Sequence, residues 1–158
     1  MIIVEDRLNI VLNKLNAIAG VKPTFRYGDE KELLAFLRSK TGSKKTPYPL
    51  IWLEYPYNEI HKKNYVTVER MNLVIAVKTI PELLNDERLE KTYKKLLIPI
   101  VDNIIEVFKK SNIVFVKNES YEITKFPNYQ DDGKHKTTDI WDAIKLTFEI
   151  QISNNCSN

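Results

Sequence analysis

The feature that most constrains the fold is a short apolar segment with a proline near each end. Between Pro49 and Pro56 the chain reads Leu-Ile-Trp-Leu-Glu-Tyr, so that large apolar side chains occupy consecutive positions. Successive side chains of a strand point to opposite faces, and both faces of this segment are therefore apolar. Proline cannot donate to a strand ladder and is expected at the margins. We predict a strand that is buried on both faces.

A second strand, over residues 66–79, has about twice the usual length. Its second half, residues 73–77, is apolar on both faces, whereas its first half carries Glu69 and Arg70. We therefore expect one end to lie in the core and the other to project. Together with the polar linker at residues 57–64, this pattern predicts a projecting β-hairpin arm.

Three amphipathic helices are predicted from apolar spacings of three and four residues. The first covers residues 3–19 and ends at Gly20, and the third covers residues 86–110. The second begins at Asp29, which forms a capping box with Glu32. Pro99 lies inside the third helix and predicts a kink near Leu96.

The last part of the chain predicts further strands. Residues 144–152 alternate strictly between apolar and polar side chains, which indicates a half-buried strand. Shorter strands are expected at residues 113–116 and 121–126, followed by a polar loop at 128–138. The fold class is therefore α+β, an antiparallel sheet with helices packed on one face. We expect a single domain over residues 1–153 and a polar tail at 154–158.

Composition is that of an ordinary globular protein. The 158 residues are 43% hydrophobic with a net charge of +3, too small by itself to indicate nucleic-acid binding. Cys156 is the only cysteine, so no internal disulfide forms, as in a reducing cytoplasm. No apolar run approaches the roughly 20 residues that span a bilayer, and no signal peptide is evident.

The search for catalytic chemistry finds no convincing pattern. Asp131, Asp132 and His135 stand close together, but lysines flank His135 and no second ligand pair follows. Glu54, Glu69 and Asp142 lack the convergent arrangement that a nuclease requires, and structural salt bridges explain them better. We predict no catalytic residue, no cofactor and no metal.

Aromatic residues and lysines are interleaved around the first strand. The cluster consists of Tyr48, Trp52, Tyr55, Tyr57 and Tyr65 with Lys44, Lys45, Lys62 and Lys63. Such a set can stack bases and hold phosphates, or it can anchor a protein interface. The simpler interpretation places Trp52 in the core, the tyrosines at the sheet margin and the lysines in solvent.

Several segments, taken in order, resemble a known family. They are Phe-Arg-Tyr-Gly-Asp at residues 25–29, Tyr-Pro-Leu-Ile-Trp-Leu at 48–53, Arg-Met-Asn-Leu-Val-Ile-Ala at 70–76, Glu-Arg at 87–88, Leu-Ile-Pro-Ile at 97–100 and Trp-Asp-Ala-Ile at 141–144. In order and spacing the chain resembles the tail-terminator, or tail-completion, proteins of tailed bacteriophages and their head-to-tail joining relatives.

The resemblance implies a non-enzymatic virion protein that closes into a ring of six or twelve copies at the head–tail junction. Adjacent portal, connector or tail proteins would be its partners, and the host cytoplasm its location during assembly. Candidate interface residues are Tyr57, Glu59, His61, Lys63, Tyr65, Arg70, Tyr129, Asp131, Asp132 and His135. Lys40, Lys44 and Lys45 are candidates for facing genomic DNA in the lumen, and no membrane contact is expected.

A second hypothesis remains open at this point. The chain would then be a nucleic-acid-binding or nuclease-like protein of a phage or mobile element, using the aromatic–lysine cluster. A third hypothesis is a small host-interaction module carried on a mobile element.

Overall fold

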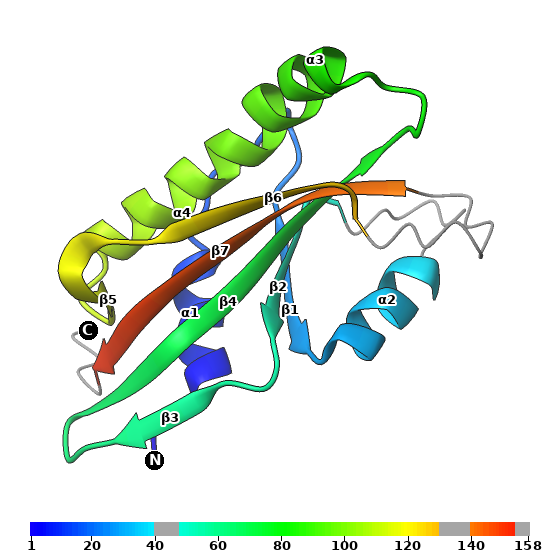
Figure 1. The fold of residues 1–158 in the computed structure, drawn as a ribbon. Coiled ribbons are helices and arrows are strands. Elements are labelled where there is room, and N and C mark those ends of the chain that lie inside the picture. Colours follow the sequence, from blue (N-terminus) through cyan, green and yellow to red (C-terminus); the bar gives the residue numbers. More distant parts are fainter. Residues whose placement is uncertain (40–47, 130–139, 154–158) are drawn as a thin grey trace.

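The computed structural model describes residues 1–39, 48–129 and 140–153. Within them the strands form one sheet in the order β1-β2-β4-β7-β5, with β3 also paired to β4 and β6 also paired to β7 (Figure 1). This is the predicted α+β class. The elements are α1 (Val4–Leu12), β1 (Thr24–Gly28), α2 (Glu30–Ser39), β2 (Leu50–Glu54), β3 (Asn58–His61), β4 (Tyr65–Thr79), α3 (Asn85–Arg88), the π-helical segment η1 (Leu89–Leu97), α4 (Ile98–Lys110), β5 (Val114–Val116), the 3-10 turn η2 (Lys117–Glu119), β6 (Glu122–Tyr129) and β7 (Ile140–Ser153).

The sheet is mixed, which corrects the prediction of a purely antiparallel one. β1 runs parallel to β2, with Phe25 opposite Ile51 and Tyr27 opposite Leu53, while the other strand pairs are antiparallel. Residues 24–28 were not predicted to form a strand. The parallel pair arises because α2 lies between β1 and β2 in the chain, and a helical crossover returns the chain in its original direction.

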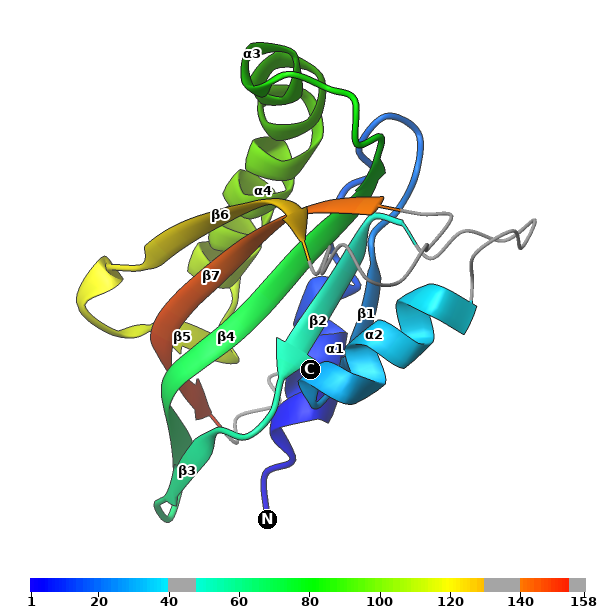
Figure 2. The same ribbon diagram turned by 45° about the vertical axis from the view of Figure 1, so that its right-hand side comes forward.

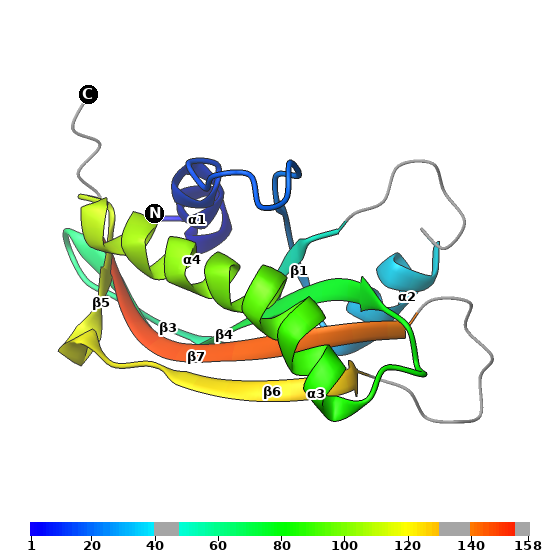
Figure 3. The same ribbon diagram turned by 90° about the horizontal axis from the view of Figure 1, so that it is seen from above.

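The helices cover both faces of the sheet, so the prediction that they gather on one face is also wrong. Cores lie on both faces because Ile51 and Leu53 of β2 pack with α1 and α4, whereas Leu50 and Trp52 pack with α2. Figure 3 shows α1 and α4 on the same side of the sheet, and Figure 2 shows α2 in front of β1 and β2 with α1 behind them. One apolar strand thus serves two cores.

The prediction for β2 itself is confirmed. Its first four side chains are 0–3% exposed. Trp52 lies in the core, as the simpler interpretation expected, and its indole nitrogen donates a hydrogen bond of 3.0 Å to the Gly28 carbonyl oxygen. Gly28 has a φ of 147°, and a Cβ there would lie 2.9 Å from Trp52 Cζ2. The glycine therefore allows the tryptophan to pack directly on the end of β1.

The long strand β4 is confirmed, and it contains a β-bulge. Its pairing with β7 shifts between Val68 and Met71, and Arg70 within the bulge has a φ of 48°. Residues three apart in a regular strand point to opposite faces, and the extra residue of the bulge cancels that difference for Val68 and Met71. The bulge therefore keeps both side chains in the same core as α1 and α4.

The third helix is confirmed as a continuous helical segment from α3 to α4. The helix is π-helical just before Pro99. The segment η1 spans Leu89–Leu97, and the Ile98 N–H donates to the Tyr93 carbonyl, five residues earlier. A proline ring clashes with the carbonyl of the residue four positions earlier, and π-helical turns relieve such crowding.

The first helix is shorter than predicted. α1 ends at Leu12, and Ile18 forms an isolated bridge with Val21. Ala19 and Gly20 both have positive φ and make the tight turn between them. The capping box of α2 is confirmed, because Asp29 N donates to Glu32 and Glu32 N donates to Asp29, at 3.1 and 2.8 Å.

β7 is half-buried, as predicted. Near its start, Asp142 takes part in a buried ion pair. Arg88 donates to Asp142 Oδ1, and these residues are 3% and 0% exposed. The same oxygen accepts the backbone N–H of Asn128 at 3.1 Å, while Oδ2 has no hydrogen-bond partner in the described part of the chain. The pair thus connects the start of the long helix to β7 and to β6.

Removing one partner of this pair should be strongly destabilising, because it leaves a buried charge unpaired. We expect Arg88→Met to lower the free energy of unfolding by roughly 3–5 kcal/mol. Arg88→Met combined with Asp142→Asn should recover part of that loss, since the amide still accepts the Asn128 N–H without a charge. Urea unfolding of both variants measures this. A double variant no more stable than Arg88→Met would show that the unpaired Asp142 charge is not the cause of the loss.

Candidate assembly interface

The candidate interface residues centre on the hairpin formed by β3 and the first part of β4. Asn58 pairs with Glu69 and His61 with Val66, and Lys62 N closes the turn by donating to the Tyr65 carbonyl at 2.9 Å. All four residues of β3 are exposed. β4 differs, because its outer half also pairs with β7 as far as Tyr65 opposite Ser153. The hairpin therefore has one strand in the sheet and one strand at its margin.

Exposed polar groups follow this margin. His61 Nε2 lies 2.6 Å from Glu59 Oε2, and both side chains remain accessible. Lys63 is exposed in the turn and Tyr65 is half-buried at the start of β4. Four of the candidates, Glu59, His61, Lys63 and Tyr65, thus lie together at one end of the sheet.

Tyr57 belongs to a cluster that the sequence did not predict. Both Tyr55 and Tyr57 donate their hydroxyl groups to Glu5 of α1, Tyr57 at 2.6 Å. The two rings meet edge to face with centroids 5.4 Å apart, and the Tyr55 ring lies 6.0 Å from Tyr27 of β1. The cluster thus joins α1, β1 and the start of β3 along one margin of the sheet.

Glu5 is ionised in this arrangement. Burial alone would raise its pKa, but the hydrogen bonds from Tyr55 and Tyr57 outweigh burial and lower it. Burial, followed by the hydrogen bond to Glu5, raises the pKa of both tyrosines above the ordinary value. The tyrosines therefore stay protonated and remain donors.

Arg70 lies in the β4 bulge, beside a polar depression on the sheet face opposite α4. This depression has a volume of about 510 Å³ and is also lined by Glu69, Thr147 and Glu149. Lys117 of η2 pairs with Glu149, and this hydrogen bond raises the Lys117 pKa. The depression is shared by β4, β7 and η2, away from the β3 hairpin turn.

Tyr129 has a different environment from the other candidates. It is only 6% exposed and belongs to the core beneath α2, where its ring lies 5.6 Å from that of Phe126. It is therefore not at the surface of the monomer. Asp131, Asp132 and His135, like Lys40, Lys44 and Lys45, lie outside the described residues.

The carboxylates that were weighed as nuclease ligands are largely engaged in structural pairs. Asp142 pairs with Arg88, and Glu54 accepts from Lys145 at 2.9 Å and from Asn72 at 3.1 Å. Thr147 extends this row by donating to Asn72 at 2.7 Å. These contacts support the interpretation of Glu54 and Asp142 as salt-bridge residues. Within the described ranges no group of three His, Cys, Asp or Glu residues is placed to hold a metal.

Two comparisons with known proteins were negative. No protein-family model matches the chain, and no curated protein sequence is significantly similar to it. No helix in residues 1–39, 48–129 and 140–153 is long and apolar enough to cross a membrane.

Sequence reasoning missed Glu5, which stands in no motif, and it gave Tyr27 no role as a site residue. Glu5 occupies the first turn of α1, where an acidic residue is ordinary. The signal available for Tyr27 was its place in the aromatic segment at residues 25–29. Only the parallel placement of β1 beside β2 brings it next to Tyr55.

The Glu5 cluster makes the free energy of unfolding depend on pH in the acid range. Because the pKa of Glu5 is lowered in the folded state, ionised Glu5 stabilises the fold at pH values above its ordinary pKa of 4.5. This stabilisation is lost as the pH falls through the folded-state pKa. We expect Glu5→Gln to be less stable than wild type near neutral pH, and the difference to shrink between about pH 5 and about pH 3. Urea unfolding across this range measures it. A difference that stays constant would show that the Glu5 charge contributes nothing.

Proposed function

We propose that the protein is a structural subunit of a tailed-phage particle. Copies would close into a ring of six or twelve at the head–tail junction, as a tail terminator or connector and without enzymatic activity. Portal, connector or tail proteins would contact the ring, and genomic DNA in the lumen would make at most non-specific contacts. Assembly would take place in the host cytoplasm.

The observation that carries the proposal is the exposed strand β3. It is held by β4 on one side, and all four of its residues are exposed. Ile60 in its centre is 42% exposed. An open strand with an apolar side chain is a ready site for pairing with another chain. The order of sequence motifs that resembles tail-terminator proteins is the reason for proposing a head–tail ring as the assembly.

The hairpin would be the projecting arm of this subunit. A closed ring of identical copies uses two different surfaces on each subunit, one reaching and one receiving. The β3 margin, with Tyr57, Glu59, His61, Lys63 and Tyr65, would be the reaching surface. Arg70 would lie further along β4 beside it.

The nucleic-acid hypothesis would use the aromatic residues of the same cluster. Trp52 is buried, whereas Tyr55 and Tyr57 are half-buried and their hydroxyl groups donate to Glu5. Base stacking requires accessible aromatic faces. A gel-shift titration with single- and double-stranded DNA at several salt concentrations tests the alternative, which requires strong binding that falls steeply with salt.

The ring proposal is tested by electron microscopy and light scattering of concentrated wild-type protein, where closed rings are expected. Ile60→Ser should reduce the fraction of protein in rings without loss of folding, because its side chain is exposed in the monomer. The matched control is Leu84→Ser, which removes a 68% exposed apolar side chain outside the hairpin. Equal ring yields for the two variants would remove the β3 margin from the interface.

A further inference from the structure

The sheet has two outer edges, and both carry exposed apolar side chains. Tyr27 of β1 is 52% exposed at one edge. At the other edge, Phe115 of β5, Tyr121 immediately before β6 and Ile123 of β6 are 41–47% exposed. Within the described residues no strand pairs with the outer side of β1 or of β6 (Figure 1). Exposed edges with apolar side chains are pairing sites, and monomeric proteins normally protect them.

Only the second half of the β6 edge has a proline or a bulge that blocks the addition of another strand. Its second half contains Pro127 and, at Asn128, a residue with a φ of 49° where the pairing with β7 shifts. Prolines and bulges of this kind block strand addition. The first half, around Ile123, has regular pairing with β7 and contains neither a proline nor a bulge. Its one lysine, Lys125, extends over the Tyr93 ring, with Nζ 5.6 Å from the ring centroid, so its charge is held over the helix rather than along the edge. This half is therefore the part of the edge that is open to another strand.

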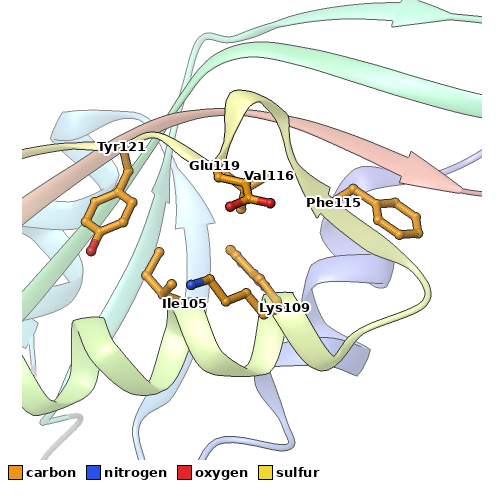
Figure 4. A pocket seen from close by; sticks show the side chains of 7 residues that line it. Ile105, Lys109, Phe115, Val116, Glu119 and Tyr121 are labelled. Atoms are coloured by element: carbon orange, nitrogen blue, oxygen red, sulfur yellow. The ribbon is translucent and has the colours of Figure 1, made fainter.

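A groove adjoins that open half on the side of α4. It has a volume of about 470 Å³ and is lined by Ile105 and Phe108 of α4 with Phe115, Val116 and Tyr121 of the β5–β6 edge. Lys109 and Glu119 add a polar region to its wall. Figure 4 shows the Tyr121 ring directed towards α4 near Ile105, and Lys109 on the helix across from Glu119. The groove suits an aromatic side chain that ends in a polar group.

The directions of the edge strands decide how two copies would pair. β1 is parallel to β2, β2 is antiparallel to β4, β4 to β7 and β7 to β6. β1 and β6 therefore run in opposite directions within one copy. When like copies follow one another in the same orientation, β1 of one lies antiparallel to β6 of the next, which is the more stable pairing.

The faces match as well as the directions. Phe25 and Tyr27 stand opposite Ile51 and Leu53, whose side chains belong to the core beneath α1 and α4. Tyr27 is therefore on the same face of the sheet as the groove at α4. In a sheet that continues from copy to copy, the neighbour's Tyr27 would arrive on the side where the groove lies.

We propose that β1 of one copy pairs antiparallel with the first half of β6 of the next copy, and that the Tyr27 ring occupies the groove between α4 and the β5–β6 edge. The Tyr27 hydroxyl group would face Lys109 and Glu119. The contact is head-to-tail, and its partner is a second copy of this chain. This inference rests on the proposed ring: it adds β1 to the reaching surface, on the same side of the sheet as the β3 margin, and it supplies the receiving surface.

The test uses one charged substitution at each edge, because lysine is a natural device that blocks strand pairing. Tyr27→Lys removes the inserting ring and Ile123→Lys blocks the receiving strand. Both positions are exposed, and circular dichroism with thermal unfolding checks that each variant folds. Ile80→Lys is the control, since Ile80 is 54% exposed and lies on neither edge strand.

Each edge variant alone should be monomeric by light scattering, whereas Ile80→Lys should assemble like the wild type. An equimolar mixture of the two edge variants should give a one-to-one dimer and nothing larger, because a single intact contact remains. Native mass spectrometry of the mixture resolves this. A dimer formed by either variant alone would indicate a symmetric contact and overturn the proposal.

The outcome separates this contact from the ring itself. Rings that persist in both edge variants would leave the ring proposal standing and refute the edge contact. Open filaments of wild-type protein that the edge variants abolish would support the edge contact and refute the closed ring. Wild-type protein that stays monomeric at every concentration would refute both.

Discussion

The structure depends on the antiparallel pairing of β4 with β7. These are the longest strands, and they pair from Tyr65 opposite Ser153 to Thr79 opposite Ile140. Every other strand joins the sheet directly on one of them, except β1, which joins through β2. The alternating side chains of β4 and β7 belong to both apolar clusters, so this strand pair packs against a core on each face of the sheet. The bulge at Arg70 keeps that alternation in register, since it holds Val68 and Met71 on one face.

This central ribbon also explains where surfaces remain for assembly. One half of the sheet face opposite α4 is covered by α2, and the rest carries the polar row of Glu54, Asn72 and Thr147. Apolar exposure is instead prominent at the margins, at Tyr27 and Ile60 on one side and at Ile123 on the other. A subunit with polar sheet surface and apolar edges is suited to association through the edges. Such contacts join different surfaces and propagate from copy to copy.

Much of the fold was predictable because local patterns and tertiary contacts agree. The strands β2, β4, β5, β6 and β7, the capping box at Asp29 and the long helix were all expected from their residues. β1 was missed because it is short: Phe25 and Tyr27 alternate with Thr24 and Arg26, but four alternating residues before a glycine are a weak strand signal. The end of α1 at Leu12 was missed because Leu15 and Ile18 continue the helical apolar spacing beyond it, although Leu15 is buried and Ile18 partly buried outside the helix. The candidate site was partly anticipated, but the Glu5 cluster was not, since its members are about 50 residues apart in the chain.

The sequence by itself determined which segments must be buried. Consecutive apolar residues in β2 require cover on both faces, and strict alternation in β7 requires cover on one. Only the tertiary structure decided which element covers which face. Among the described helices, α2 alone covers its side of the sheet because the β1–α2–β2 crossover places it there, and the same crossover makes β1 an edge. Long-range pairing also joined Arg88 to Asp142 and Glu5 to Tyr57. Such contacts depend on the path of the whole chain, which local sequence patterns do not specify.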